Sequence, residues 1–217
     1  HLDRETASEP IEVIPRDGHP PLSFAQERLW YLDRLEPNST TYNIRCAVRM
    51  AGPLDIAVLE RSLNEIVARY EILRTRFVVE DETPRQVIES SLQLTIPVTD
   101  FSAVPAEEQQ SRLKDLLRTA SRKPFDLAHG PLIRATCVRM NPSEHVLMFM
   151  LHHTVFDGSS HGFLLRELST LYEAFDAGLE SPLTNVPVQY ADYAIWQRNK
   201  LEREYDQLFA YWEDILR

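Results

Sequence analysis

Apolar residues recur along the chain with two different periods, and each period predicts a different kind of element. Where apolar side chains repeat every three or four positions, an amphipathic helix is expected. The segments with this spacing are 22–35, 54–73, 107–122, 159–178 and, as one long helix or two short ones, 190–217. Ser23 stands at the expected N-cap of the first helix, and Pro37 ends it.

Strand-like patterns, either alternating or continuously apolar, fill most of the intervals between these helices. They cover 41–52, 73–81, 84–90, 92–98, 131–140 and 144–153, with a short β-like patch at 11–14. The turn at 141–143 should join the last two strands as a hairpin. Because the chain is apolar without a break from Val146 to Leu151, the second of them is expected inside the sheet with both faces covered.

Together these elements predict an α/β fold of the α+β type. It should be a two-layer sandwich in which helices cover a mixed, largely antiparallel sheet. Residues 1–10, which are rich in charges, are expected to form a linker or flexible N-terminus, and residues 11–217 a single domain. With 217 residues, of which 43% are hydrophobic, the chain can bury a sizeable core.

Charge and cysteine usage exclude several functional classes. The formal net charge of −10 repels polyanions, so nucleic acid is not an expected partner. The longest apolar run, at 146–151, is far shorter than the roughly 20 residues that cross a bilayer, so no membrane span is expected. Cys46 and Cys137 form neither a CxxC pair nor a disulfide framework, and no signal peptide is recognised, so a cytoplasmic location is predicted.

The segment with the most chemical content runs from 151 to 160. Two histidines end the apolar strand, and an Asp157-Gly158 turn follows them. A strand would hold an imidazole rigidly, burial would remove water from it, and a pKa of about 6.5 would let it accept a proton near neutrality. Adjacent side chains on a strand point to opposite faces, so we expect one of His152 and His153 to face a reaction and the other to support it.

Asp157 has two possible roles. It could orient His153 as the carboxylate of a catalytic triad does, or it could pair with a buried cation and fix the loop. Arg74 and Arg76 share one face of a predicted strand, so one of them could reach Asp157. We favour the ion pair.

Other interpretations of this segment are also open. The histidines could be ordinary core side chains. Ser159 and Ser160 could be nucleophiles, although N-capping is the favoured role at the start of a helix. Gly158 could supply a positive φ, keep the space above His153 clear, or both. No metal site is expected, because His152 and His153 diverge and no second ligand follows at the helical spacing of zinc enzymes.

Four segments, in this order, resemble the condensation domains of nonribosomal peptide synthetases, which have the chloramphenicol acetyltransferase-like fold. They are LSFAQERLWYLDRL at 22–35, RYEILRTRF at 69–77, MLHHTVFDGSS at 150–160 and VQYADYAIWQR at 188–198. The HHxxxDG motif alone is shared with other acyltransferases, whereas the four segments together are specific. The resemblance covers nearly all the chain from about residue 11 but only the N-terminal lobe of the family's architecture, so the C-terminal lobe is expected to be absent.

The resemblance implies roles for individual residues. His153 matches the active-site histidine, and His152 matches the structural residue before it. Asp157 matches a carboxylate that pairs with an arginine, for which Arg74 is the first choice and Arg76 the alternative.

The residues of the following turn are also implied in the site. Gly158 matches a glycine beside the acceptor channel, and Ser159 and Ser160 are candidates for lining the site. Ser159 departs from the family pattern, because many members have tryptophan there. The departure bears on local packing and on the subtype of the domain.

The implied reaction is amide bond formation. A donor acyl or peptidyl thioester, held on the 4'-phosphopantetheine arm of an upstream peptidyl carrier protein, is attacked by the amino group of an aminoacyl thioester on the downstream carrier. No cofactor is expected to be bound by the domain itself. Because the family's active site lies between two lobes, this single lobe is expected to fold but not to catalyse condensation at a useful rate alone.

Two other functions remain open. A catalytically silent module could recruit carrier proteins, although the intact HHxxxDG motif counts against it. An epimerization-type relative would instead move a proton on an aminoacyl thioester. The entry helix at 22–35, which contains Trp30, and the LRTRF segment at 73–77 count against that alternative.

Overall fold

The computed structural model describes residues 10–16 and 18–216, so nearly all of the predicted linker at 1–10 lies outside the described residues. The helices are α1 (Phe24–Leu35), α2 (Ile56–Arg69), the 3-10 helix η1 (Glu71–Arg74), α3 (Ala106–Ser121), α4 (Ser160–Asp176) and α5 (Tyr190–Leu216). The strands are β1 (Asn43–Ala51), β2 (Thr75–Glu80), β3 (Thr83–Ile88), β4 (Val98–Asp100), β5 (Ile133–Asn141) and β6 (Glu144–His152).

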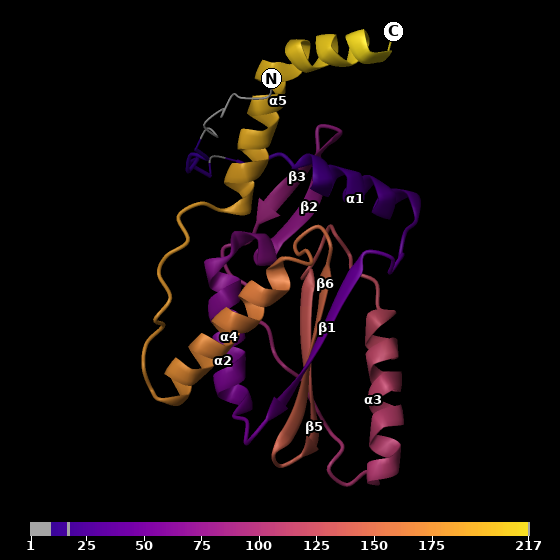
Figure 1. Ribbon diagram of the computed structural model, residues 1–217, viewed down its shortest axis with the longest axis vertical. Coiled ribbons are helices and arrows are strands. Elements are labelled where there is room, and N and C mark those ends of the chain that lie inside the picture. Colours follow the sequence, from indigo (N-terminus) through magenta and orange to yellow (C-terminus); the bar gives the residue numbers. More distant parts are fainter. Residues whose placement is uncertain (1–9, 17, 217) are drawn as a thin grey trace.

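Four of the strands form one mixed sheet in the order β1-β6-β5-β4, of which β1, β6 and β5 are labelled in Figure 1. β6 pairs antiparallel with both β1 and β5, and the short β4 pairs parallel with β5. β2 and β3 form a separate antiparallel hairpin. The prediction of an α/β fold with a largely antiparallel sheet is therefore confirmed, and β6 lies in the sheet interior as predicted.

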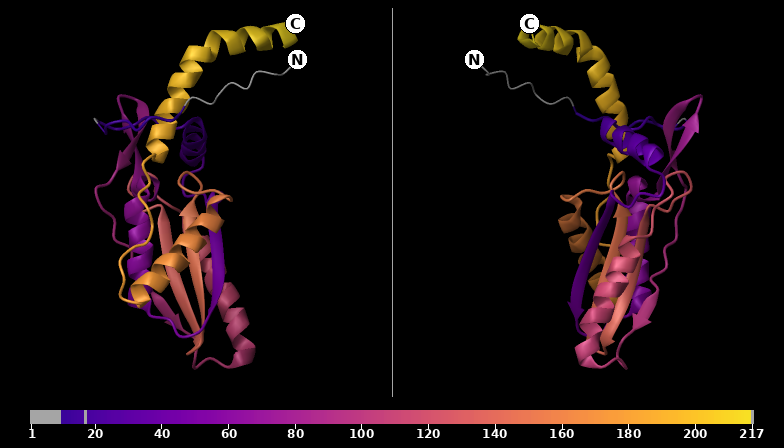
Figure 2. Two further views of the ribbon diagram at one scale, coloured as in Figure 1. Left: turned by 60° about the vertical axis from the view of Figure 1, so that its left-hand side comes forward. Right: turned by 90° about the vertical axis from the view of Figure 1, so that its right-hand side faces the viewer.

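Helices cover both faces of this sheet, with α3 and α4 on opposite sides (Figure 2). On β6, Leu147, Phe149 and Leu151 belong to the core that includes side chains of α2 and α4. The alternate residues Val146 and Met148 pack in a second core with side chains of α3. Because both faces of β6 are dry, the strand is apolar at every position from 146 to 151.

The first helix begins where the sequence predicts. The Ser23 side chain accepts a hydrogen bond from the Gln26 amide at 3.2 Å, and the Gln26 side chain accepts one from the Ser23 amide at 3.0 Å. This reciprocal capping box satisfies two amide groups that the first turn of a helix leaves free. Both residues are buried, so the cap is fixed within the body of the protein.

The strand predicted at 92–98 is wrong over most of its length, because only Val98 belongs to a strand. Leu94 and Ile96 are buried, as the alternating pattern required. Their backbone groups bond to side chains of α2 rather than to a neighbouring strand. The Leu94 amide donates to Asn64 Oδ1 at 2.7 Å, and the Ile96 amide donates to Glu60 Oε1 at 2.6 Å. Side chains on a helix have replaced the strand partner.

Two smaller predictions also change. The β-like patch at 11–14 is not a strand; its Ile14 amide donates to the side chain of Asp192 at 3.0 Å. Arg74 ends η1, and strand β2 starts after it at Thr75. The premise that Arg74 and Arg76 lie on one strand is therefore wrong.

The C-terminal segment is a single helix, α5, that extends away from the rest of the body (Figures 1 and 2). Near its start Ala191 and Ala194 are buried, whereas Tyr205, Phe209 and Trp212 are exposed. Among the described residues, no helix combines the length and the apolarity that crossing a membrane requires.

Candidate functional site

The two histidines lie where β6 ends, and hydrogen bonds from both neighbouring segments fix their backbone. The His152 amide donates to the Leu132 carbonyl at 3.0 Å, and the His153 amide donates to the Tyr42 carbonyl at 2.9 Å. The sheet therefore holds both residues rigidly, as the sequence predicts. Their side chains have different surroundings, since His152 is buried and His153 is exposed.

His152 is enclosed by aromatic rings and by its own loop. Its ring centroid lies 6.5 Å from that of Tyr42 and 6.2 Å from that of Phe125, both with edge-to-face geometry. The Thr154 amide donates to Nδ1 at 3.3 Å, and the Thr154 hydroxyl lies 2.9 Å from the same atom. Burial, with a smaller contribution from His153, lowers the pKa of His152 to about 4. The ring is neutral near pH 7 and serves as a packed support.

His153 has the geometry of a reactive imidazole. Its Nδ1 lies 3.0 Å from the Phe156 carbonyl oxygen, which can only accept a hydrogen bond, so Nδ1 carries the proton. The lone pair of the neutral ring is then on Nε2, the nitrogen that can accept a proton. The predicted burial of this ring is wrong for this chain, because the residue is exposed.

The predicted ion pair of Asp157 is also wrong. Asp157 is exposed, and its Oδ1 accepts hydrogen bonds from the Ser160 amide at 2.9 Å, the Ser160 hydroxyl at 2.6 Å and the Ser159 hydroxyl at 2.8 Å. These bonds, with that from the Ser160 hydroxyl the strongest, hold the pKa of Asp157 below its usual value. A carboxylate that is solvated and supplied with three local donors needs no guanidinium.

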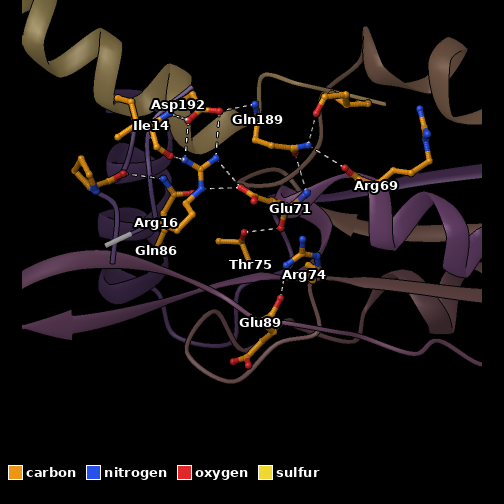
Figure 3. A network of polar contacts seen from close by, with 12 residues as sticks. Ile14, Arg16, Arg69, Glu71, Arg74, Thr75, Gln86, Glu89, Gln189 and Asp192 are labelled. Carbon is orange, nitrogen blue, oxygen red and sulfur yellow. Dashed lines mark hydrogen bonds and ion pairs between the residues drawn. The ribbon is translucent and has the colours of Figure 1, made fainter. Parts of the chain in front are cut away.

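The two candidate arginines instead bind the end of β3. Arg74 donates through Nη1 to the Glu89 carbonyl (Figure 3), and Arg76 Nε lies 2.6 Å from Glu89 Oε1. Within the described residues, neither arginine forms an ion pair with Asp157. Both arginines therefore secure the β2–β3 hairpin and do not contact the loop between β6 and α4 (residues 153–159), which we call the histidine loop.

The residues after Asp157 serve the start of α4. Ser159 occupies the N-cap position, but its side chain makes no cap bond, and Asp157 takes the amide of Ser160 in its place. Both serine hydroxyls are directed at Asp157, so the favoured capping role for the serines belongs to that carboxylate. The positive φ considered for Gly158 is wrong, and a Cβ added there would meet no atom within 4 Å. Its place beside an acceptor channel stays a prediction.

Two side-chain contacts of the α1 cap residues were missed by sequence reasoning, and one of them supports the histidine loop. Gln26, in the entry helix, donates from Nε2 to the Thr154 carbonyl at 3.3 Å. The Ser23 hydroxyl lies 3.0 Å from the hydroxyl of Tyr190, whose pKa is raised mainly by burial. The available signal was the family motif around Ser23 and Gln26, because helix periodicity alone does not show that a cap residue also supports a distant loop.

An acid–base cluster does exist, at a different place (Figure 3). The Asp192 side chain has no exposed surface, and its carboxylate binds Arg16 with contacts of 2.7 and 3.2 Å. Arg16 also binds Glu71 Oε2 at 2.9 Å. The backbone amide of Gln189 donates to the Asp192 carboxylate at 2.7 Å. One network therefore joins the start of α5, the N-terminal segment and η1. The residues are up to 176 positions apart, and no local pattern in the sequence announces the pair.

A family model described as the condensation domain matches residues 16–217. The chain belongs to the condensation domain family. One of the linear gramicidin synthase proteins of Brevibacillus parabrevis is 48% identical to this condensation domain chain over 205 residues, which are 94% of the chain and 4% of that protein. Phosphinothricin tripeptide synthetase PhsC of Streptomyces viridochromogenes is 39% identical over 221 residues, which are 100% of the chain and 20% of that protein. The chain thus spans only a small part of these curated relatives.

Solved structures agree with the observed fold. The starter condensation domain of rhizomide synthetase RzmA superposes with a TM-score of 0.81 at 23% identity, covering 91% of this chain and 49% of the other. The X-domain of teicoplanin biosynthesis, solved as a complex with OxyB, superposes with a TM-score of 0.79 at 30% identity, covering 94% of this chain and 45% of the other. The fold prediction is confirmed, and this chain corresponds to about half of each solved chain.

Proposed function

We propose that this chain supplies the histidine-bearing lobe of a condensation domain that forms amide bonds between two thioesters. The observation that carries the proposal is the state of His153. Its Nδ1 proton is directed at the Phe156 carbonyl, which leaves the Nε2 lone pair to accept a proton, and the residue is exposed. The membership in the family and the order of its four motifs support the same reaction.

The proposed chemistry moves one proton, from the amine nitrogen to the leaving sulfur. The amino nitrogen of the acceptor thioester forms a bond to the donor's thioester carbon, the carbon–sulfur bond breaks, and the donor arm leaves as a thiol. Nε2 of His153 would take the proton of the amine and pass it to the leaving sulfur, or it would hold the amine in place while that proton moves to the sulfur. A positioned acid–base group contributes about 10²- to 10⁴-fold, whereas holding two reactants together contributes up to about 7–11 kcal/mol. Positioning by the complete site can therefore outweigh proton transfer.

The partners of this lobe follow from the same proposal. Upstream and downstream peptidyl carrier proteins would deliver the two thioesters on their 4'-phosphopantetheine arms, in the cytoplasm. A second lobe would complete the site, as suggested by the coverage of about half of each solved condensation structure. We expect the 217-residue chain to fold but to form no peptide from two loaded carriers by itself.

The test uses the complete condensation domain that contains this lobe, with both carriers loaded. His153→Ala should lower single-turnover product formation at least about 100-fold while leaving the circular dichroism spectrum unchanged. His129→Ala, which changes an exposed histidine away from the site, is the matched control and should keep full turnover. Normal turnover by the His153 variant would remove the catalytic role.

A binding module is the second candidate, favoured by one observation. The X-domain, 30% identical to this chain, was solved in complex with OxyB, so this architecture can hold a protein partner. If the chain is such a module, the His153→Ala variant should bind the partner as tightly as the wild type does, and the wild type itself should show no turnover. An epimerization-type activity would instead exchange the α-proton of an aminoacyl thioester, which deuterium incorporation detects.

A further inference from the structure

A cavity of about 280 Å³ lies between α2, η1 and the start of α4. Its walls are mostly apolar and include Ile66, Ile72, Leu73, Phe156, Phe163 and Leu164. A cavity of about 150 Å³ holds benzene, and pockets for drug-sized ligands begin at about 300 Å³. The space therefore suits one large side chain rather than a whole phosphopantetheine arm.

One acidic group breaks the apolar wall. Glu167 lines the cavity together with Tyr70, whose hydroxyl donates to Glu167 Oε1 at 2.7 Å. Burial, with a smaller contribution from that bond, raises the pKa of Tyr70 to about 12, so the phenol remains a donor. Glu167 Oε2 is buried and has no hydrogen-bond partner among the described residues.

The neighbouring arginine does not satisfy this oxygen. Arg69 Nε lies 3.9 Å from Glu167 Oε2, and in the part of the chain that the structure describes Nε has no hydrogen-bond partner either. The other guanidinium nitrogens donate to the carbonyls of Leu183 and Thr184, and these bonds keep Arg69 from moving closer to Glu167. Arg69 therefore offsets the charge of Glu167 at a distance but leaves an acceptor free. Buried acceptors are normally paired, so Glu167 Oε2 is available to a donor that enters the cavity.

The cavity is next to the reactive histidine. Phe156 forms part of the cavity wall, and its carbonyl accepts the hydrogen bond from Nδ1 of His153. Phe156 is thus a neighbour that the cavity and His153 share. Ser160, which binds Asp157, also lines the cavity.

We propose that this cavity binds the side chain of one of the two aminoacyl substrates, and that Glu167 selects an aromatic-sized apolar side chain ending in a hydrogen-bond donor. The tyrosine side chain is the simplest example of that chemistry. The inference rests on the proposed condensation function, and it adds a specificity-determining residue to the site.

The first experiment measures binding by the 217-residue chain. N-Acetyl-tyrosine and N-acetyl-phenylalanine thioesters of N-acetylcysteamine are titrated while amide chemical shifts are followed by NMR. Shifts should change at Ile72 and Phe163, and the tyrosine probe should bind about tenfold more tightly, since it adds one bond to a carboxylate. Glu167→Gln, which keeps an acceptor for Tyr70, should reduce that ratio below about threefold.

Two variants make this result decisive. Glu173→Gln changes an exposed carboxylate on the same helix outside the cavity and should keep the tenfold ratio. Ile72→Trp should fill the cavity and weaken both probes at least tenfold. No saturable binding, or a ratio that Glu167→Gln leaves unchanged, overturns the proposal; if the Trp variant does not fold, the Glu167 ratio decides alone.

Two substrates could supply the side chain, and turnover separates them. In the complete domain, tyrosine and phenylalanine are exchanged first on the donor and then on the acceptor carrier, and kcat/KM is compared for wild type and Glu167→Gln. The arm whose ratio falls is the one that uses the cavity. If neither arm responds while His153→Ala abolishes turnover, the cavity proposal is wrong and the condensation function stands. Normal turnover by His153→Ala would reject the function itself.

Discussion

Two aspartates in this lobe meet the same requirement for compensated charge in opposite ways. Asp157, after the histidines, is exposed and takes three hydrogen bonds from the two serines that follow it. Asp192, at the start of α5, has no exposed side-chain surface and binds the guanidinium of Arg16. Sequence reasoning expected the ion pair at the first of these positions, and the structure has it at the second.

The difference shows that burial decides which partner a carboxylate needs. Water and hydrogen-bond donors from neighbouring residues are sufficient to stabilise the charge of an exposed carboxylate at the start of a helix. A buried carboxylate without a counter-ion would be very unstable, so a buried one is paired. The Asp192 pKa is lowered even though burial, the largest influence, raises it, because the bonds from Arg16 and from the Gln189 and Ile14 amides together prevail.

The largest expected effect comes from breaking the buried pair. Asp192→Ala leaves Arg16 without its principal partner and frees the amides of Ile14 and Gln189, so the free energy of unfolding should fall by about 3–5 kcal/mol. Urea denaturation followed by circular dichroism measures this change. Asp206→Ala, at an exposed position of the same helix, should change it by less than about 0.5 kcal/mol. Equal effects would show that the network is not important for stability.

Acid titration separates the contribution of the buried His152 imidazole to stability from the contributions of the Asp157 and Asp192 carboxylates, because they act in different pH ranges. The unfolded chain protonates a histidine near pH 6.5, whereas folded His152 takes a proton only at about 4, so stability is full above pH 6.5 and declines as the pH falls toward 4. The expected loss is about 3 kcal/mol. His145, buried with a lowered pKa, acts in the same window, and the carboxylates of Asp157 and Asp192 act below it.

The measurement is the slope of the unfolding free energy against pH between 6.5 and 4. His152→Asn should flatten this slope by the contribution of one proton. A variant with the wild-type slope would contradict the assignment of the transition to His152.

Removing the exposed carboxylate should have a smaller effect than removing the buried one. Asp157→Ala deletes the acceptor for the Ser160 amide at the start of α4, and loss of such a cap costs about 1 kcal/mol. Asp157→Asn keeps an acceptor oxygen and should retain most of the stability. A loss of about 3 kcal/mol or more in the alanine variant would instead indicate a buried ion pair and restore the original expectation.

The fold was predictable to the extent that contacts are local or periodic. The unbroken apolar run at 146–151 correctly placed β6 in the sheet interior, and Ser23 correctly marked the start of α1. The strand predicted at 92–98 was wrong because Asn64 and Glu60 on α2 supply its hydrogen bonds. Alternation of apolar residues reports burial and says nothing of which group pairs with the backbone.

The site was predictable to a smaller extent. Adjacency on a strand correctly separated the environments of His152 and His153. The spacing of Asp157, Ser159 and Ser160 contained the signal of a local turn, which the expectation of an ion pair overrode. The support from Gln26 and the pair between Arg16 and Asp192 join segments more than 100 positions apart, and one sequence alone gives no measure of such distances.

The smallest expected effect on stability comes from filling the open space beside Gly158. Gly158→Ala should change the unfolding free energy by less than about 0.5 kcal/mol, because the backbone there is not left-handed and the added Cβ meets nothing within 4 Å. Gly178→Ala is the matched control and should cost about 1 kcal/mol or more, because Gly178 has φ +72°.

The same substitution gives a second result in the complete domain. If the space beside Gly158 belongs to the acceptor channel, the added methyl group should lower kcat/KM for the acceptor while the unfolding free energy stays constant. Unchanged kcat/KM would mean that substrate does not pass this residue. A large loss of stability would mean that the turn after Asp157 is under a constraint that its three exposed hydrogen bonds do not explain.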